Sequence, residues 1–206
     1  MTARNEGQQI DTLPSQMYVK DSDGKVIPLI MGVDGSTNSL QTIDYAHHEV
    51  HSGSHYFIDE VADLSINNVY DMQFTTPDTT KWGHFIFTLS VQSETEWMIY
   101  EDAVITNAGI AVPCYNNNRN SVNTCGMVIT SHLNTNLAGA NADTDVTGAT
   151  LIRHGKIGSG RGNAATDERG NETILKQNTI YCMRAIAEAA GYINFDLNWY
   201  EHTNKN

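Results

Sequence analysis

Charged and aromatic side chains are scarce in this chain: Asp, Glu, Lys and Arg make up 17% of its 206 residues, and Phe, Trp and Tyr make up 8%. Asn, Thr, Ser and Gly are abundant instead. This balance disfavours long helices and favours short strands joined by many turns. The sequence also has no apolar run of 18 residues, which excludes a membrane-spanning helix from the expected elements.

Positive charge is scarce as well, because 12 basic residues stand against 24 acidic ones and give a formal net charge of −12. The few Lys and Arg residues are scattered and form no basic stripe. Such a surface repels phosphate backbones and anionic lipids, which argues against direct binding of nucleic acid or of a membrane surface. The polar N-terminus, Met1–Gln16, does not resemble a signal peptide, so we expect a soluble protein made in a cytosol.

Cysteine is rare, and the three present, Cys114, Cys125 and Cys182, match no Cys-x-x-Cys zinc or redox pattern. A bridge between Cys114 and Cys125 across a hairpin is geometrically conceivable. Because nothing in the sequence points to an oxidising compartment, we expect all three thiols to be reduced.

Apolar residues are sparse up to about residue 40, where turn-forming residues are dense. We therefore divide the chain into an N-terminal arm, residues 1–40, and a single domain, residues 41–206. Within the arm, "MYVKDSDGKVIPLI" places Asp21–Gly24 between two short apolar runs. This pattern predicts a small hairpin in which Gly24 supplies the positive φ of the turn.

Alternating apolar and polar residues dominate the domain. In "WGHFIFTLSV", Phe85 and Phe87 share one face with two further apolar residues, and in "GYINFDLNWYEH" Phe195 and Trp199 do the same. Eight or nine strands of this kind predict an all-β fold, an antiparallel β-sandwich with one buried face per sheet and a jelly roll as its expected topology. A short helix within Met183–Gly191 is the alternative left open there.

The three tryptophans lie at strand ends among apolar neighbours, which is typical of core or interface anchors. The predicted anchors are Trp82, Phe85, Phe87, Trp97, Phe195 and Trp199.

Four histidines fall within "HHEVHSGSHYF". The metalloprotease pattern needs a helix with Glu directly after the first His, and we expect Gly53 to disfavour a helix here. On a strand, His47, His51 and His55 would share one face with Glu49. These three histidines are weak candidate metal ligands, but the sequence shows neither a further ligand at a suitable spacing nor an open pocket. We therefore predict a polar strand face or contact without a structural metal.

Other chemical motifs are weaker. Ser22–Lys25 has the Ser-x-x-Lys form but falls in the predicted turn of the arm. The glycine-rich segment after His154 lacks the Lys-Ser or Lys-Thr ending of a phosphate-binding loop. The carboxylates Asp59, Glu60 and Asp63 leave a glycosidase pair open, because its geometry comes from the fold, but charged loops of this kind usually keep a protein soluble. We predict neither an enzymatic activity nor a cofactor.

The segments "HHEVHSGSHYF", "TTPDTTKWGHFIF", "IYEDA", "NNNRNS", "ILKQNTIYCMRA" and "NWYEHT" together resemble tailed-bacteriophage virion structural proteins, most of all capsid decoration or cement proteins. The resemblance runs from Ile43 to His202. It implies a β-sandwich on the capsid exterior with a terminal arm that reaches a neighbouring subunit, made in the host bacterial cytoplasm. It carries over no catalytic residue.

The partners expected on this basis are the major capsid protein and further copies of the chain, most simply as a homotrimer. Two other hypotheses stay open at this point. One is a tail-fibre or tail-associated component that binds the host surface, and the other is a hydrolase or metal enzyme.

Overall fold

The computed structural model describes residues 18–20, 26–28, 45–134, 144–158, 164–166 and 172–203. The chain divides into two compact units, residues 1–44 and residues 45–206. In the first unit, β1 (Tyr18–Lys20) pairs antiparallel with β2 (Val26–Pro28). These strands flank the predicted turn at Asp21–Gly24, which itself lies outside the described residues, as does most of the predicted arm.

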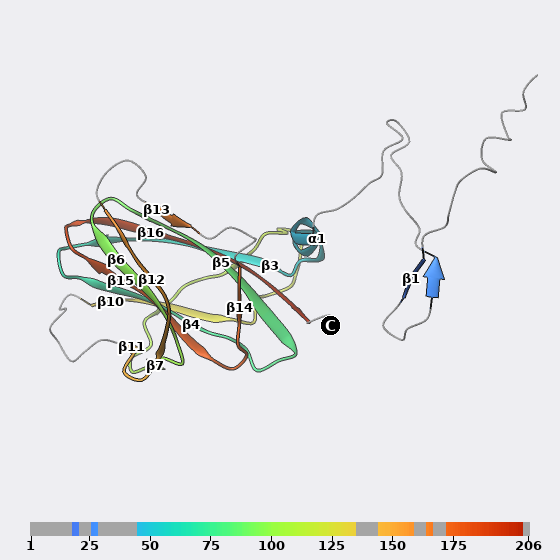
Figure 1. Cartoon of the computed structure of the whole chain (residues 1–206). Coiled ribbons are helices and arrows are strands. Elements are labelled where there is room, and N and C mark those ends of the chain that lie inside the picture. Colours follow the sequence, from blue (N-terminus) through green and yellow to red (C-terminus); the bar gives the residue numbers. More distant parts are fainter. Residues whose placement is uncertain are drawn as a thin grey trace, which may run out of the picture. The chain divides into compact units, whose positions relative to one another are not determined.

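The second unit is an antiparallel β-sandwich, which confirms the predicted fold class (Figure 1). One sheet has the order β12 (Thr150–Ile157), β6 (Thr95–Glu101), β15 (Ile180–Ala187), β4 (Val69–Thr75), β10 (Val128–Asn134), β8 (Ile110–Ala111). The other has the order β13 (Ala164–Thr166), β5 (Lys81–Val91), β16 (Gly191–Thr203), β3 (His55–Leu64), β9 (Tyr115–Asn116), and β14 (Thr173–Leu175) also pairs with β5. The finer expectation of jelly-roll connectivity stays a prediction.

The core lies between these sheets and follows the predicted alternation. On β5 and β16 the residues that point inward are buried, and their neighbours along each strand face outward. The inward residues are Phe85, Phe87, Leu89 and Val91 on β5 and Ile193, Phe195, Leu197 and Trp199 on β16. Burial of a large apolar side chain contributes about 1.5–3 kcal/mol, so these two paired strands supply much of the driving force for folding.

Strand β4 departs from the prediction of one buried face, because nearly all its residues are buried. The outer face holds Asp71 and Gln73, and β11 (Thr144–Asp145), paired with β7 (Val104–Ile105), lies over it. Gln73 Nε2 donates a hydrogen bond of 2.8 Å to Thr144 Oγ1. This local cover removes polar side chains from water while supplying hydrogen-bond partners.

The histidine-rich segment is a helix, α1 (Tyr45–Ser52), so the predicted strand is wrong there. Gly53 adopts φ 72°, and its N–H donates to the Val50 carbonyl at 3.1 Å. A glycine in the left-handed region commonly ends a helix. Gly53 therefore ends α1 and does not prevent the helix from forming before it. The helix considered as an alternative within Met183–Gly191 does not form, since β15 continues as a strand to Ala187.

Candidate interaction surface

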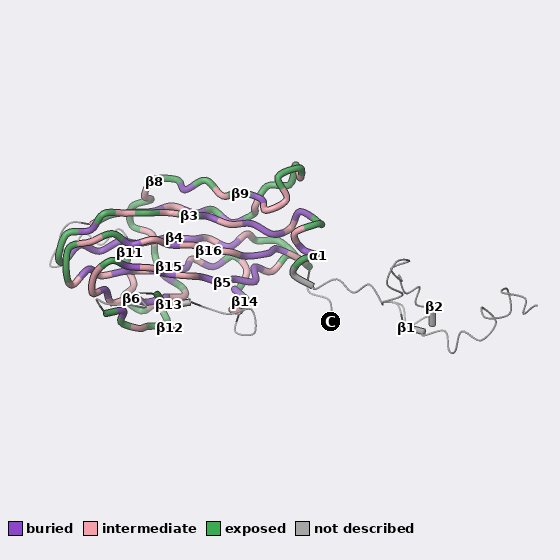
Figure 2. The backbone as a smooth tube through the Cα atoms, turned by 90° about the horizontal axis from the view of Figure 1, so that it is seen from above, coloured by how far each residue is buried: buried purple, intermediate pink, exposed green. Residues whose placement is uncertain are grey.

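A segment that we name the strap, residues 110–125, joins the two sheets along one edge of the sandwich. Its β8 pairs with β10 of the first sheet, and its β9 pairs with β3 of the second. Between them, the Val112 N–H donates to the Ile129 carbonyl at 3.0 Å. In Figure 2 the chain from β8 to β9 runs along one side of the sandwich, with exposed residues along it. The strap thus closes an edge at which strand hydrogen-bonding groups would otherwise be open.

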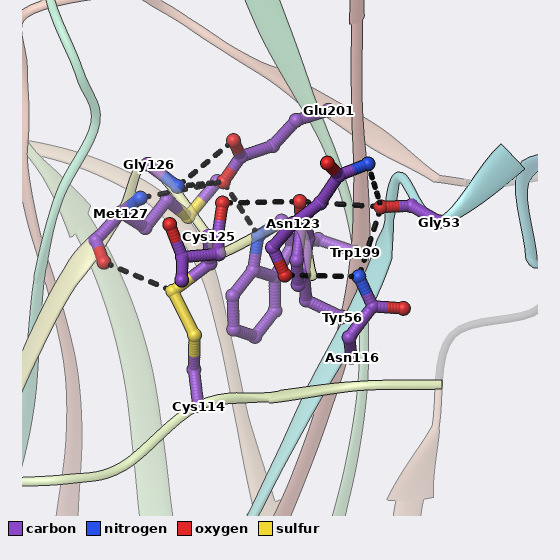
Figure 3. The surroundings of a disulfide bond; sticks show 11 residues. Gly53, Tyr56, Cys114, Asn116, Asn123, Cys125, Gly126, Met127, Trp199 and Glu201 are labelled. Atoms are coloured by element: carbon purple, nitrogen blue, oxygen red, sulfur yellow. Dashed lines mark hydrogen bonds between the residues drawn. A yellow bond between two sulfur atoms is a disulfide. The ribbon is translucent and has the colours of Figure 1, made fainter. Parts of the chain in front are cut away.

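A disulfide between Cys114 and Cys125 closes the loop of the strap (Figure 3), so the expectation of reduced thiols at these two positions is wrong. The two Cα atoms are 6.8 Å apart, although the residues are 11 apart in sequence. The loop after β9 turns back on itself as the spacing allowed, so the inference from the compartment is what failed. Cys182, by contrast, is a buried free thiol, and burial raises its pKa.

Hydrogen bonds from the loop converge on the backbone where α1 ends. The carbonyl of Gly53 accepts from Asn116 Nδ2 at 2.9 Å and from Asn123 Nδ2 at 3.2 Å (Figure 3). Asn118 Nδ2 donates to the His51 carbonyl at 3.1 Å. The asparagine-rich composition of this loop therefore serves to attach it to the end of the helix.

The base of the loop is held by Glu201, a buried carboxylate on β16. It accepts hydrogen bonds from the N–H of Gly126 at 2.9 Å, the N–H of Met127 at 3.3 Å and Trp199 Nε1 at 3.1 Å. A Cβ at position 126 would lie 2.9 Å from Glu201 Oε2 and 3.0 Å from Pro77 Cγ, which explains the glycine. Two backbone N–H groups and one indole N–H thus satisfy this buried carboxylate in place of water.

A hollow of about 260 Å³ is lined by residues of the strap and by Tyr56, which is buried. Burial, followed by the charge of Glu201, raises the pKa of Tyr56, whose hydroxyl donates to the Thr124 carbonyl at 3.1 Å. At the rim, the guanidinium of Arg119 lies 5.4 Å from the ring centroid of Tyr115. The surface is thus a rigid loop with aromatic, amide and guanidinium groups.

The histidines once expected on one strand face are separated by the structure. His47 and His51 are exposed on α1, one turn apart, with their Nε2 atoms at 2.8 Å. His55 is buried at the start of β3 and contacts the side chain of Asn117. Within the described residues, no group of three or more His, Cys, Asp and Glu is placed to hold a metal ion.

A second histidine cluster, which the sequence analysis missed, forms where β14, β5 and β16 meet. His84 Nδ1 is 2.8 Å from Glu172 Oε1, and His84 Nε2 is 2.8 Å from His202 Nε2. The hydroxyl of Tyr200 donates to Glu172 at 2.8 Å. His84 and Tyr200 are cross-strand partners, so only knowledge of the strand pairing would have brought these residues together.

His202 Nδ1 also lies 2.8 Å from the Thr203 carbonyl, an oxygen that can only accept a hydrogen bond. The cluster therefore joins the end of β16 to β5 and β14 as a satisfied polar network.

The predicted anchors fall into two groups. Phe85, Phe87, Phe195 and Trp199 are in the core. Trp97 is partly buried against the core, with its ring 5.3 Å from that of Phe87, while Trp82 is half-buried near the end of the sheet.

The comparisons with known proteins give no relative: no family model, no curated protein and no solved structure matches this chain. In the part of the chain that the structure describes, no helix is both long and apolar enough to cross a membrane.

Proposed function

We propose that this protein is a structural component of a tailed-phage virion, which binds the exterior of the assembled capsid and stabilises it. In this role its partners are the major capsid protein and other copies of itself, as a homotrimer. It acts by binding, without an enzymatic activity. The sequence motifs given above motivate this proposal, since they resemble decoration proteins over Ile43–His202.

The observation that carries the proposal is the division of the chain into two compact units. All core residues identified in the described part of the chain come after Tyr45. In this proposal the separate N-terminal unit adds contact area on a neighbouring subunit, which would raise the effective concentration of the attached domain at its site.

The Cys114–Cys125 disulfide supports a location on a particle surface outside the cell. Disulfides persist in oxidising environments, including virion surfaces, and are rare in a reducing cytosol. A protein made in the host cytoplasm and released with the particle would form this bond on release.

The test uses capsids that lack the protein. Full-length protein and a variant without residues 1–44 are mixed with them, and co-sedimentation and the temperature of DNA release are measured. We expect full-length protein to bind and to raise the release temperature, and the truncated form to fold but bind more weakly. If full-length protein does not bind capsids but binds tails or host cells, the tail-associated function replaces capsid decoration. The hollow beside Tyr115 is then the proposed site for recognition of the host surface.

A further inference from the structure

Acidic residues are absent from a long central stretch of this acidic protein. All 24 Asp and Glu residues lie outside Ala103–Ala142, which includes the whole strap. The strap carries a single charged side chain, Arg119. A partner with negative charge therefore meets less repulsion at the strap than at the carboxylate-bearing surfaces of the sandwich.

The strap also exposes large apolar side chains. Ile110 is 80% exposed, Val122 is 94% exposed and Tyr115 is 44% exposed. Apolar groups around an aromatic and an arginine are the composition that protein interfaces favour at their centres, where charged residues other than Arg are depleted.

Three other described cations are paired with carboxylates. Arg184 pairs with Asp71, Lys156 with Glu94 and Glu188, and Lys176 with Glu101. Within the described residues no carboxylate pairs with Arg119, and its recorded contact is the ring of Tyr115. A guanidinium has five N–H donors, and a flat ring contact leaves the fork of donors available for a carboxylate of another molecule.

The loop that presents Arg119 is held by hydrogen bonds that do not depend on the disulfide. The disulfide closes it, the Gly53 carbonyl holds two of its asparagines, and Glu201 holds its base. A preorganised loop loses little conformational entropy on binding, so more of the contact energy appears as affinity.

We propose that the strap is the face with which the sandwich sits on the capsid, and that the capsid surface presents a carboxylate to Arg119 beside an apolar area for Val122 and Tyr115. This inference rests on the proposed function and adds the contact surface and the chemistry of the partner. It assigns the strap, in addition to the N-terminal arm, to capsid binding.

The test compares full-length variants in co-sedimentation with capsids that lack the protein. Arg119→Glu reverses the charge of the strap, and Val122→Asp places a carboxylate among its apolar groups. Lys81→Glu and Leu151→Asp are the matched controls, since both positions are exposed and lie on other strands. We expect each strap variant to bind about tenfold or more weakly and each control to bind like wild type. Arg119→Lys keeps the charge but loses the paired donors, so it should bind with intermediate affinity.

All four substituted positions are exposed, so we expect the sandwich to stay folded in each variant. Thermal unfolding of each variant checks this. If both strap variants bind capsids as tightly as wild type, the inference is wrong while the capsid function stands. If wild type itself does not bind capsids, both proposals fail. If the strap variants change only self-association in sedimentation velocity, the occupant of the strap is a second copy of the chain, and the capsid contact is overturned.

Discussion

Arg184 on β15 donates two hydrogen bonds, each 2.7 Å long, to the two carboxylate oxygens of Asp71, its cross-strand partner on β4. Its Nη2 also donates to the Thr144 carbonyl at 2.8 Å. Burial opposes the charge of Arg184, but the bond to Asp71 outweighs it and the pKa of Arg184 rises. One paired guanidinium thus holds β11 over the outer face of the first sheet.

We predict that Arg184→Met destabilises the protein by about 3–5 kcal/mol, because it leaves the carboxylate of Asp71 buried without its partner. The double variant Arg184→Met with Asp71→Leu should be more stable than the single one, since no uncompensated charge is left. Urea unfolding of the two single variants, the double variant and wild type gives the coupling energy. A double variant whose loss equals the sum of the single losses would contradict the pairing.

The disulfide of the strap provides a second prediction. Cys114→Ser with Cys125→Ser should lower the free energy of unfolding by about 2–4 kcal/mol, because the open loop gains conformational freedom in the unfolded chain. Treatment of wild type with a reductant should lower its melting temperature, while the double variant should not respond. Cys182→Ser is the control for the presence of a free thiol. A reductant effect that persists in the double variant would place the sensitivity elsewhere.

The sequence predicted the sheets better than it predicted the loops, for physical reasons that particular residues show. Apolar and polar residues alternate along β5 and β16 because each strand has one buried face. Phe87 and Phe195 are buried, as that alternation predicted. The helix α1 was missed because Gly53 ends it instead of disrupting it. The Cys114–Cys125 bridge fits its spacing and was missed because the expected compartment argued against it. The contact of His84 with His202 depends on strand pairing between residues far apart in sequence, which local patterns do not encode.

The third prediction concerns Glu101. Its hydrogen bond with Lys176 lowers its pKa, burial acts in the opposite direction, and a further hydrogen bond from Tyr181 lowers the pKa again. The Lys176 Nζ lies 2.5 Å from Glu101 Oε1. A carboxyl with a lowered pKa in the folded state adds stability above its unfolded pKa of about 4.3, and that stability is lost as the pH falls through the folded pKa. Glu101→Gln should therefore be less stable than wild type at neutral pH, and the difference should vanish in strong acid.

Urea unfolding across this pH range measures the Glu101 effect, with Glu96→Gln on the same strand as the control for loss of one negative charge. An equal stability difference at neutral and strongly acidic pH would show that the ionised carboxylate is not the source.

The last prediction concerns Asp196, the cross-strand partner of Asp59 on the outer face of the second sheet. Burial and then the negative charge of Asp59 raise the pKa of Asp196, although the side chain of Asn198 donates to its carboxylate at 2.5 Å. A raised pKa means that ionisation costs more in the folded state than in the unfolded one, so above the folded pKa this carboxyl reduces stability. Below the unfolded pKa of about 3.9 both states are protonated, and the penalty disappears.

Asp196→Asn keeps an acceptor for Asn198 and should make the protein more stable at neutral pH, with a gain that falls to nothing in strong acid. Asp59→Asn should stabilise in the same direction, because it removes the second cause, and should lower the pKa of Asp196 in a carboxyl NMR titration. If Asp196→Asn destabilises the protein at neutral pH, the pairing of these two carboxylates is not a source of repulsion.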